Sequence, residues 1–257
     1  MSRTFLIAEA GVCHNGEFGT ALKLADAAKD AGADACKFQL FSSRKLWKDD
    51  RIKHLELSQI QMIDIAAYCK AIGIEFMCTP FDVESLEFLV KLKVQRIKIA
   101  SGCLGNFDLL YGAYQTGLPV ILSTGMSDLK DIERALDTLA ANVTLLHCTS
   151  SYPCRLEDVN LRAMDTLRKF GYPVGLSDHT SGITVPIAAV ARGATVIEKH
   201  LTLDRRQRGP DNKASIEPRE FKAMRLGIME VEYALGSPEK RVLACEEGLR
   251  KAWRVPS

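Results

Sequence analysis

Two short stretches, Gly175-Leu176-Ser177-Asp178-His179-Thr180 and Val196-Ile197-Glu198-Lys199-His200, decide the fold of this chain. Each begins as an apolar run and ends abruptly in acidic, basic and imidazole side chains. Strands that are buried up to their last residues and then carry polar chemistry are typical of the C-terminal rim of a parallel barrel. We therefore interpret both stretches as barrel strands that end at a functional face.

The same transition occurs eight times along the sequence, and apolar runs alternate with longer amphipathic stretches. We expect strands at residues 4–10, 34–40, 74–79, 95–101, 119–124, 143–148, 173–178 and 195–200. We expect helices at residues 19–31, 58–73, 83–93, 107–117, 128–140, 159–170, 183–193 and 217–235. Eight such units predict an α/β fold, a (β/α)8 TIM barrel that occupies residues 1–257 as a single domain. A doubly wound open sheet would need a glycine-rich phosphate turn after its first strand, and residues 10–16 carry no such fingerprint.

Composition narrows the class of protein further. The 34 basic and 32 acidic residues are intermixed and give a formal net charge of +2, which argues against nucleic acid or an anionic membrane as the main partner. No segment approaches the roughly 20 apolar residues of a membrane span, and the N-terminus lacks a signal pattern. The eight cysteines form no C-x-x-C pair, so most are expected to pack in the core. A cytoplasmic enzyme is the default expectation.

The expected strand ends gather residues suited to an anion and a metal ion. Lys37 and Lys98 lie near the ends of two expected strands, at adjacent positions of the rim. Together with nearby hydroxyls, they predict an anion site. His179 and His200 end adjacent strands, so their imidazoles can converge on one divalent ion, with manganese, cobalt or zinc favoured over magnesium. Histidines 14 and 147 also lie at strand ends but can equally hydrogen-bond a neighbouring carboxylate. A lysine Schiff base at Lys37, Lys98 or Lys199 is an alternative chemistry.

Two carboxylates accompany these groups at the rim. Glu9 and Glu198 can orient ligands or carry protons, or they can neutralise Lys37 or Lys199. Nucleophilic catalysis by a serine has less support, because the stretch from Gly175 lacks the G-x-S-x-G elbow. An adjacent Asp178-His179 pair on a strand also points its two side chains to opposite faces.

Ordered motifs along the whole chain resemble the sialic acid synthase family. They begin with Ile7-Ala8-Glu9-Ala10-Gly11-x-x-His14-Asn15-Gly16 and Gly32-Ala33-Asp34-Ala35-x-Lys37-Phe38-Gln39, and continue with Cys78-Thr79-Pro80-Phe81-Asp82, Lys98-Ile99-Ala100-Ser101-Gly102 and Leu122-Ser123-Thr124-Gly125-Met126-Ser127. They close with Leu146-His147-Cys148-Thr149-Ser150-x-Tyr152-Pro153, Gly175-x-Ser177-Asp178-His179-Thr180, Glu198-Lys199-His200 and Gly209-Pro210-Asp211-x-Lys213-Ala214-Ser215. So many motifs in one order make the resemblance specific.

The resemblance implies a transferase of carbohydrate biosynthesis that condenses phosphoenolpyruvate with N-acetylmannosamine or a related amino-sugar aldehyde, giving a nonulosonic acid and phosphate. It implies that His179 and His200 hold Mn²⁺, with Co²⁺ or Mg²⁺ as alternatives. It implies that phosphoenolpyruvate lies among Lys37, Thr79, Lys98, Ser101, Ser123, Ser150 and Ser177. It implies that the sugar faces Glu9, Gln39, Tyr152 and Asp211. The catalytic candidates are Glu9, Lys98 and Glu198.

The sequence departs from the family pattern in two places. Cys103 stands where members usually carry an acidic residue, so another group such as Glu9 takes over proton handling or the reaction differs. The family usually continues into a small antifreeze-like domain, whereas this sequence ends at Ser257, so we expect the catalytic barrel alone. A homodimer is expected, with a separate cap domain or chain as an alternative. Both departures keep open a non-catalytic or altered-substrate paralogue that binds phosphoenolpyruvate or a sugar.

Overall fold

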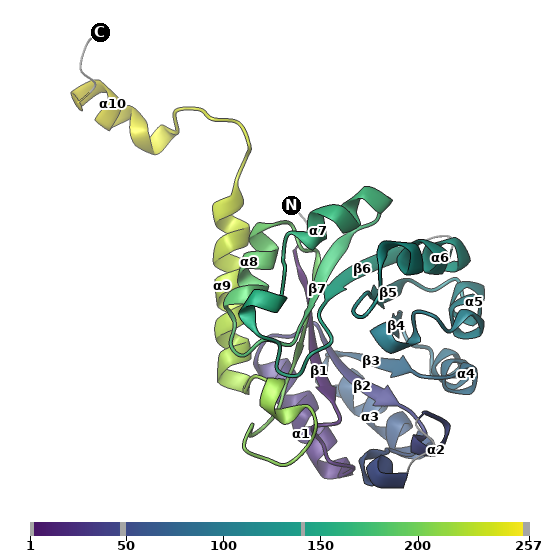
Figure 1. Cartoon of the computed structure of the whole chain (residues 1–257). Helices are drawn as coiled ribbons and strands as arrows, with labels where there is room; N and C mark the ends of the chain where they lie inside the picture. Colours follow the sequence, from purple (N-terminus) through teal and green to yellow (C-terminus); the bar gives the residue numbers. More distant parts are fainter. Residues whose placement is uncertain (1–2, 47–49, 140–141, 254–257) are drawn as a thin grey trace.

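The computed structural model describes residues 3–46, 50–139 and 142–253, and eight parallel strands stand inside a ring of helices (Figure 1). The strands are β1 (Phe5–Gly11), β2 (Ala35–Leu40), β3 (Glu75–Pro80), β4 (Ile97–Ile99), β5 (Val120–Ser123), β6 (Val143–Cys148), β7 (Val174–Asp178) and β8 (Val196–His200). Hydrogen-bonded neighbours follow the order β3-β2-β1-β8-β7-β6-β5-β4, and the two end strands, β3 and β4, lie in contact. The predicted TIM barrel is therefore confirmed.

Eight of the ten described helices overlap the ranges that the apolar spacing predicted, whereas the short helix after β2 and the last helix were not predicted. The ten are α1 (Phe18–Asp30), α2 (Ser43–Leu46), α3 (Gln59–Ile72), α4 (Val83–Lys91), α5 (Phe107–Gln115), α6 (Leu129–Leu139), α7 (Ala163–Leu167), α8 (Thr184–Ala191), α9 (Pro218–Leu235) and α10 (Glu247–Trp253). Local chemistry fixes their ends: Ser58 and Gln61 form a reciprocal capping box at the start of α3, and Gly73 ends that helix in the left-handed conformation.

One expected helix is much shorter than the sequence indicated. The helix predicted at residues 159–170 is reduced to α7 and a 3₁₀ turn over Arg168–Phe170. The preceding segment packs on the strand ends instead: the Cys154 backbone N–H donates to the His179 carbonyl, and Val159 O contacts His147 Nε2 at 2.6 Å. Asn160 then adopts a positive φ of 48°, which a continuing helix does not allow. Tertiary contacts override the local pattern here.

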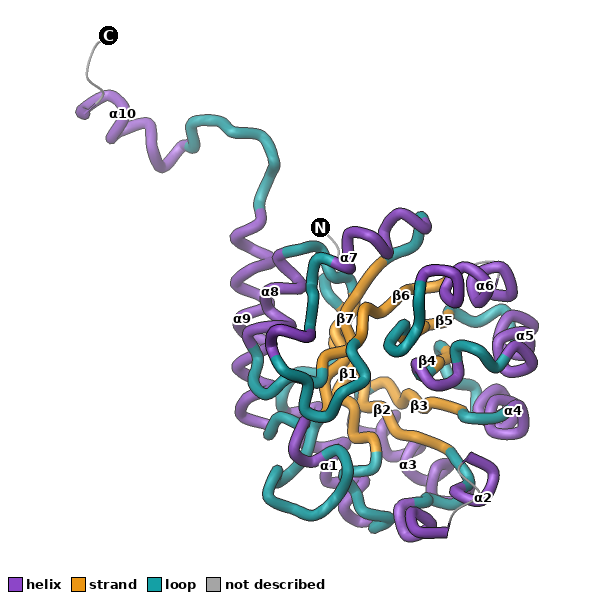
Figure 2. Tube along the Cα trace, in the orientation of Figure 1, coloured by secondary structure: helices purple, strands orange, loops and turns teal. Residues whose placement is uncertain are grey.

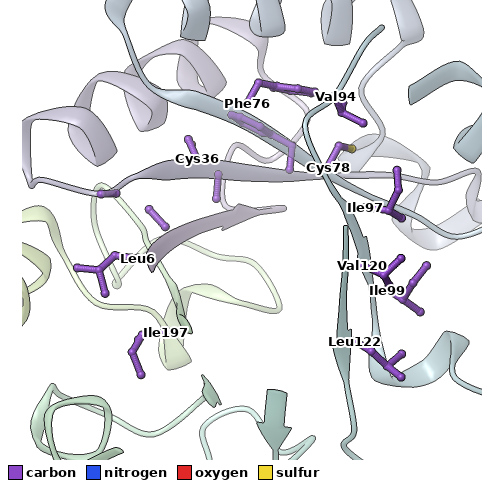
Figure 3. Close-up of a cluster of buried hydrophobic side chains, with 14 of the residues drawn as sticks. Leu6, Cys36, Phe76, Cys78, Val94, Ile97, Ile99, Val120, Leu122 and Ile197 are labelled. Carbon is purple, nitrogen blue, oxygen red and sulfur yellow. The ribbon is translucent and has the colours of Figure 1, made fainter. Parts of the chain in front are cut away.

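Strict alternation along the strands separates two layers of side chains. Ile7, Ala35, Met77, Ile121, Leu146 and Val196 form a small apolar cluster inside the barrel. Their chain neighbours, such as Leu6 and Ile197, point outward into the main core between strands and helices (Figure 3). Because side chains alternate with a period of two, the residues two positions beyond the inner cluster also face the interior. In this way Glu9 follows Ile7, Lys37 follows Ala35 and Glu198 follows Val196 into the upper barrel.

The chain beyond the last strand completes the ring and then leaves it. Helix α9 contacts both α8 and α1, and so fills the place between the last and first units. Beyond it, α10 lies away from the barrel (Figure 1), and every described residue from 233 to 253 is exposed. None of the described helices combines the length and the hydropathy needed to cross a bilayer.

A glycine in β7 allows the close approach of β8. A Cβ atom at Gly175 would overlap the Val196 carbonyl oxygen and lie 2.7 Å from Leu146 Cδ2. Because backbone cannot yield cheaply, we expect Gly175→Ala to lower the free energy of unfolding by about 1–3 kcal/mol, measured by urea denaturation. Gly19→Ala is the matched control, since a Cβ there meets no heavy atom within 4 Å. Equal midpoints for the two variants would contradict the expectation.

Candidate active site

One cavity of about 450 Å³ lies at the C-terminal ends of the strands, among the loops drawn in teal in Figure 2. All fourteen residues predicted for the site line it: Glu9, Lys37, Gln39, Thr79, Lys98, Ser101, Ser123, Ser150, Tyr152, Ser177, His179, Glu198, His200 and Asp211. They come from all eight strand ends and from the loop after β8. The barrel therefore brings together side chains that are up to 202 positions apart in sequence, as Glu9 and Asp211 are.

The floor of the cavity is a buried network of charges around Lys37. Lys37 Nζ lies 2.6 Å from Glu9 Oε2 and 3.5 Å from Glu198 Oε2, and it donates to Thr79 Oγ1 at 3.0 Å. Gln39 Nε2 donates to the other oxygen of Glu9, Oε1, at 2.9 Å. Lys37 is only 2% exposed, so its ammonium depends on these partners in place of water.

Lys98 forms the second cationic centre of the floor. Its Nζ donates to Ser123 Oγ at 2.7 Å and to Ile99 O at 3.1 Å, and it lies 3.6 Å from Glu198 Oε1. Ser177 Oγ donates to the same Glu198 oxygen at 2.9 Å. Glu198 thus stands between two ammonium groups, and an anionic ligand that entered here would meet both of them.

Burial and pairing shift the protonation of these groups in different directions. For Glu198, burial alone would raise the pKa, but Lys37 and Lys98 outweigh it and hold the pKa at about 2. For Glu9, burial raises the pKa although the Lys37 ammonium opposes it. Burial would lower the pKa of Lys37, but Glu198 and Glu9 raise it above its ordinary value. Burial does lower the pKa of Lys98, against the attraction of Glu198. Glu198 is therefore the fixed anion and Glu9 the carboxyl that more readily holds a proton.

Small residues bring backbone close to the same floor. The Gly125 N–H donates to Ser101 Oγ at 3.0 Å. A Cβ at Gly125 would lie 3.0 Å from Ser101 Oγ and 3.2 Å from Cys148 Sγ, so any larger residue would intrude on this wall. Ser150 and Ser123 also line the cavity, so this wall presents small hydroxyl groups that can form hydrogen bonds around the two lysines.

The two imidazoles predicted as metal ligands lie side by side above this floor. The ring centroids of His179 and His200 are 5.5 Å apart. A ring nitrogen coordinates zinc, for example, at about 2.0–2.1 Å, so rings at this spacing can share one ion. His179 Nδ1 lies 2.8 Å from Thr149 O, a contact that orients a ligating imidazole through its other nitrogen. His200 Nδ1 lies 3.6 Å from Asp211 Oδ2 and is buried without a hydrogen bond.

The donor set therefore fits a divalent ion held by two imidazoles. In residues 3–46, 50–139 and 142–253, no group of three or more His, Cys, Asp or Glu side chains has the arrangement of a metal site. Within that part of the chain, an ion on His179 and His200 would take its other ligands from water or substrate. Open coordination positions are typical of catalytic rather than structural metal sites.

The approach of the β8 loop to these rings depends on Gly11. Gly11 has a positive φ of 51°, and a Cβ there would lie 2.6 Å from Asp211 Oδ2 and 3.3 Å from His200 Nδ1. The free space lets Asp211 accept a hydrogen bond from the Val12 N–H at 3.3 Å. Tyr152 covers the rings from the β6 side, with its ring centroid 4.0 Å from that of His179 and 5.7 Å from that of His200.

Several polar residues at the expected rim do not line this cavity. Lys199 is fully buried on the outer face of β8, where its Nζ lies 2.6 Å from Asp178 Oδ2, so it is no candidate for Schiff-base chemistry in the cavity. Asp178 pairs with Lys199 there while His179 lines the cavity, so the two neighbours point to opposite faces, as alternation along the strand predicts. His147 faces a separate groove between α6 and α7. His14 is buried and does not line the cavity, and Cys103 packs in the main core.

The apolar part of the lining was not predicted from the sequence. Val12, Phe41, Ile52, Leu55 and Phe81 all border the cavity, together with Met126 and Cys148. Phe81, Met126 and Cys148 lie within the quoted motifs, which was the one signal for them. The other four lie in connecting segments, and apolar residues in such segments give no sign of whether they face a core or a ligand.

His14 makes a testable contribution to acid sensitivity. Its Nδ1 accepts a hydrogen bond from the Gly16 N–H at 3.0 Å, and burial lowers its pKa to about 4. Because the unfolded imidazole titrates near 6.5, the unfolded state binds more protons between these values, and stability falls as pH falls from about 6.5 to about 4. We expect His14→Asn, which keeps a hydrogen-bond acceptor, to make the free energy of unfolding fall less steeply with decreasing pH, by up to about 1.4 kcal/mol per pH unit. The expectation would be contradicted if the free energy of unfolding, measured by urea denaturation, fell with pH at the same rate in the wild type and the variant.

Comparisons of sequence and structure relate this chain to known proteins. A model of the NeuB family matches residues 24–240. The uncharacterized protein MJ1065 of Methanocaldococcus jannaschii is 48% identical over 247 residues, covering 92% of this chain and 73% of that protein. The N,N'-diacetyllegionaminic acid synthase of Legionella pneumophila is 44% identical over 265 residues, covering 92% and 74%. The crystal structure of an N-acetylneuraminic acid synthetase from Leptospira borgpetersenii, in complex with citrate, has a TM-score of 0.92 at 36% identity and covers 98% of this chain and 93% of that one.

Proposed function

This chain belongs to the NeuB family, and from that premise we propose that it condenses phosphoenolpyruvate with an N-acylated amino-sugar aldehyde to give a nonulosonic acid and phosphate. The relatives named above as synthases support an enzyme of this class. The observation that carries the proposal is that two buried lysines and two adjacent imidazoles line the same cavity. Cationic and hydroxyl donors suit an anionic substrate, and the imidazole side suits a carbonyl acceptor.

The floor of the cavity would bind phosphoenolpyruvate. Lys37 and Lys98 would each give an ammonium to its anionic groups, and Ser101, Ser123 and Ser177 would donate hydroxyl hydrogen bonds. Glu198, held ionised between the lysines, keeps both of them charged and limits how many anionic oxygens the floor accepts. Charge on the departing phosphate would be stabilised by the same two ammonium groups.

In the reaction, C3 of phosphoenolpyruvate bonds to the aldehyde carbon, the aldehyde oxygen gains a proton, water adds at C2 and phosphate leaves. We assign Glu9 to proton handling, because burial raises its pKa and it lines the cavity with Gln39 bound to one oxygen. Gln39, Tyr152 and Asp211 would orient the acceptor. A divalent ion, Mn²⁺ in our proposal, would be held by His179 and His200 and would polarise the aldehyde when bound. Buried Cys103 does not border the cavity, so its thiol is no candidate for this role.

The proposal is tested by mixing the protein with phosphoenolpyruvate, Mn²⁺ and a panel of N-acylated amino sugars and measuring phosphate release. We expect release that depends on both the sugar and the metal. Silence across the panel, with phosphoenolpyruvate binding retained in calorimetry, would instead favour a regulatory protein that binds the same ligand. Borohydride trapping of a substrate adduct on Lys98 would favour the lysine aldolase.

Removing one imidazole tests the metal assignment. We expect His200→Ala to raise the Mn²⁺ concentration for half-maximal activity at least about tenfold, since losing even an outer partner of a metal ligand costs about 10–100-fold in affinity. Direct Mn²⁺ binding by electron paramagnetic resonance gives a readout that is independent of turnover. The control is His54→Ala, because the cavity lining does not include His54. Equal Mn²⁺ affinity in both variants would refute the assignment.

A further inference from the structure

The loop between β8 and α9 is closed at its base by backbone pairing. Leu201, at the start of the loop, and Ile216, near its end, form an isolated parallel bridge. The Ile216 N–H also donates to the His200 carbonyl at 2.9 Å. Pro210 and Asp211, which line the cavity, lie between these two ends. The loop therefore returns to the strand end that carries one of the two imidazoles.

Four buried polar side chains lie between this loop and the loop after β1. We call Cys13, Thr202, Asn212 and Ser215 the loop cluster; each is at most 2% exposed, and none of them lines the cavity. Thr202 Oγ1 donates to Asn212 Oδ1 at 2.6 Å, and Asn212 Nδ2 donates to the Arg208 carbonyl at 3.3 Å. Cys13 Sγ and Ser215 Oγ lie 3.4 Å apart, within hydrogen-bond reach. Because a buried polar group is costly without a partner, these bonds favour one arrangement of the loop.

The loop cluster is connected to the backbone of Asp211. Ser215 Oγ donates to the Asp211 carbonyl at 2.8 Å, and the Ala214 N–H donates to the same oxygen at 3.1 Å. The Asp211 side chain places Oδ2 3.6 Å from His200 Nδ1, which is buried without a hydrogen bond from the described part of the chain. A small movement of Asp211 thus decides whether this ring nitrogen gains a carboxylate partner, the contact that usually orients a metal-binding imidazole.

Gly209 leaves the space that the Asn212 amide occupies. A Cβ at Gly209 would lie 2.5 Å from Asn212 Nδ2 and 3.1 Å from Asn15 Oδ1. Asn15 and Cys13 both belong to the loop after β1, and β1 and β8 are paired strands. The loop cluster is therefore built where the loops of two neighbouring strands meet.

We propose that the loop cluster positions Asp211, and through it sets both the acceptor end of the cavity and the His200 imidazole. The inference rests on the proposed function, in which Asp211 orients the acceptor and His200 holds the divalent ion. The members of the cluster are positioning residues, because they act through the Asp211 backbone and do not line the cavity. Misplacing a substrate-positioning group by about 1 Å can lower the rate about a hundredfold, so hydrogen bonds outside the cavity can matter to the reaction.

Two substitutions of Thr202 test the proposal. Valine keeps the branched shape of threonine and removes its hydroxyl, whereas serine keeps the hydroxyl. We expect Thr202→Val to raise both the KM for N-acetylmannosamine, or for a better acceptor from the panel, and the dissociation constant of Mn²⁺ about tenfold, a usual effect of losing outer partners of a metal site. The KM for phosphoenolpyruvate should not change, because Lys37 and Lys98 extend from β2 and β4. Thr202→Ser should behave like the wild type.

Electron paramagnetic resonance measures Mn²⁺ binding without substrate and so does not depend on turnover. Thr138→Val is the matched control, since it removes a hydroxyl that donates to the Arg134 carbonyl on the exposed side of α6, and it should change none of these constants. If Thr202→Val and Thr202→Ser have equal constants, or if Thr202→Val lowers kcat alone, the cluster only stabilises the loop and the proposal is wrong.

A second variant guards against a Thr202→Val protein that does not fold. Ser215→Ala removes the hydroxyl bonded to the Asp211 carbonyl and should raise the same two constants, while unchanged constants would overturn the proposal. If no sugar of the panel supports phosphate release by the wild type, the proposed function itself fails. The Mn²⁺ dissociation constants of the variants still show in that case whether the loop cluster acts on His200.

Discussion

Alanine at position 98 is expected to reduce phosphate release from phosphoenolpyruvate by about 10²–10³-fold, because removing one preorganised electrostatic donor from an active site has an effect of that size. The Lys98 ammonium is 2% exposed and is held by Ser123 Oγ at 2.7 Å and Ile99 O at 3.1 Å, so its position is fixed before a substrate arrives. Without it, the departing phosphate would be left with Lys37 alone. The loss should appear mainly in kcat when saturating phosphoenolpyruvate is used.

Two further variants separate charge from packing. Lys98→Met keeps most of the side-chain volume and removes the charge, so it should lose nearly as much activity as the alanine variant. Lys91→Ala, at the exposed end of α4, removes a lysine with no place in the cavity and should be fully active. Circular dichroism and the urea midpoint report whether the barrel remains folded. Activity of Lys98→Met within about tenfold of wild type would mean that Lys98 does not stabilise the departing charge.

The barrel and the polar half of its site were predictable because both follow from local rules. A period of two within each apolar strand determines which side chains face inward. A charged side chain at an inward position near the C-terminal end of a strand is therefore expected to line the cavity at that end of the barrel. Lys37 and Lys98 are of this kind, and both line the cavity. The helix ends were predictable for the same reason, since the caps at Ser58 and Gly73 are local chemistry.

The rest of the site depends on contacts between segments far apart in sequence. Phe41 and Leu55 are apolar residues in connecting segments, and only the packed loops show that they border a cavity rather than the main core. The short α7 has the same origin, because the Cys154 N–H donates to the carbonyl of His179, the residue after β7. Alternation alone could have removed Lys199 from the rim residues, since His200 next to it faces the cavity.

Lys199→Met is expected to lower the free energy of unfolding by about 3–5 kcal/mol, the usual cost of removing one partner from a buried ion pair. Lys199 Nζ lies 2.6 Å from Asp178 Oδ2, and the two side chains are 0% and 2% exposed. Thr180 Oγ1 also donates to Asp178 Oδ2, at 2.9 Å, and Lys199 donates to the Thr180 carbonyl. The variant would leave the Asp178 carboxylate buried with the Thr180 hydroxyl but no cation. Urea denaturation measures the loss, and Arg206→Met, which breaks the exposed pair with Asp204, is the control.

The double variant Asp178→Asn/Lys199→Met distinguishes an unpaired charge from lost packing. If the cost lies in the unpaired carboxylate, the double variant should be more stable than Lys199→Met, because no uncompensated charge remains. Asp178 and Lys199 are also register partners of β7 and β8, and the residues that follow them in sequence are His179 and His200. Loosening this register should therefore separate the two imidazoles and weaken Mn²⁺ binding even where the barrel stays folded. A destabilised Lys199→Met protein with unchanged Mn²⁺ affinity would show that the pair holds the strands together without setting the spacing of the rings.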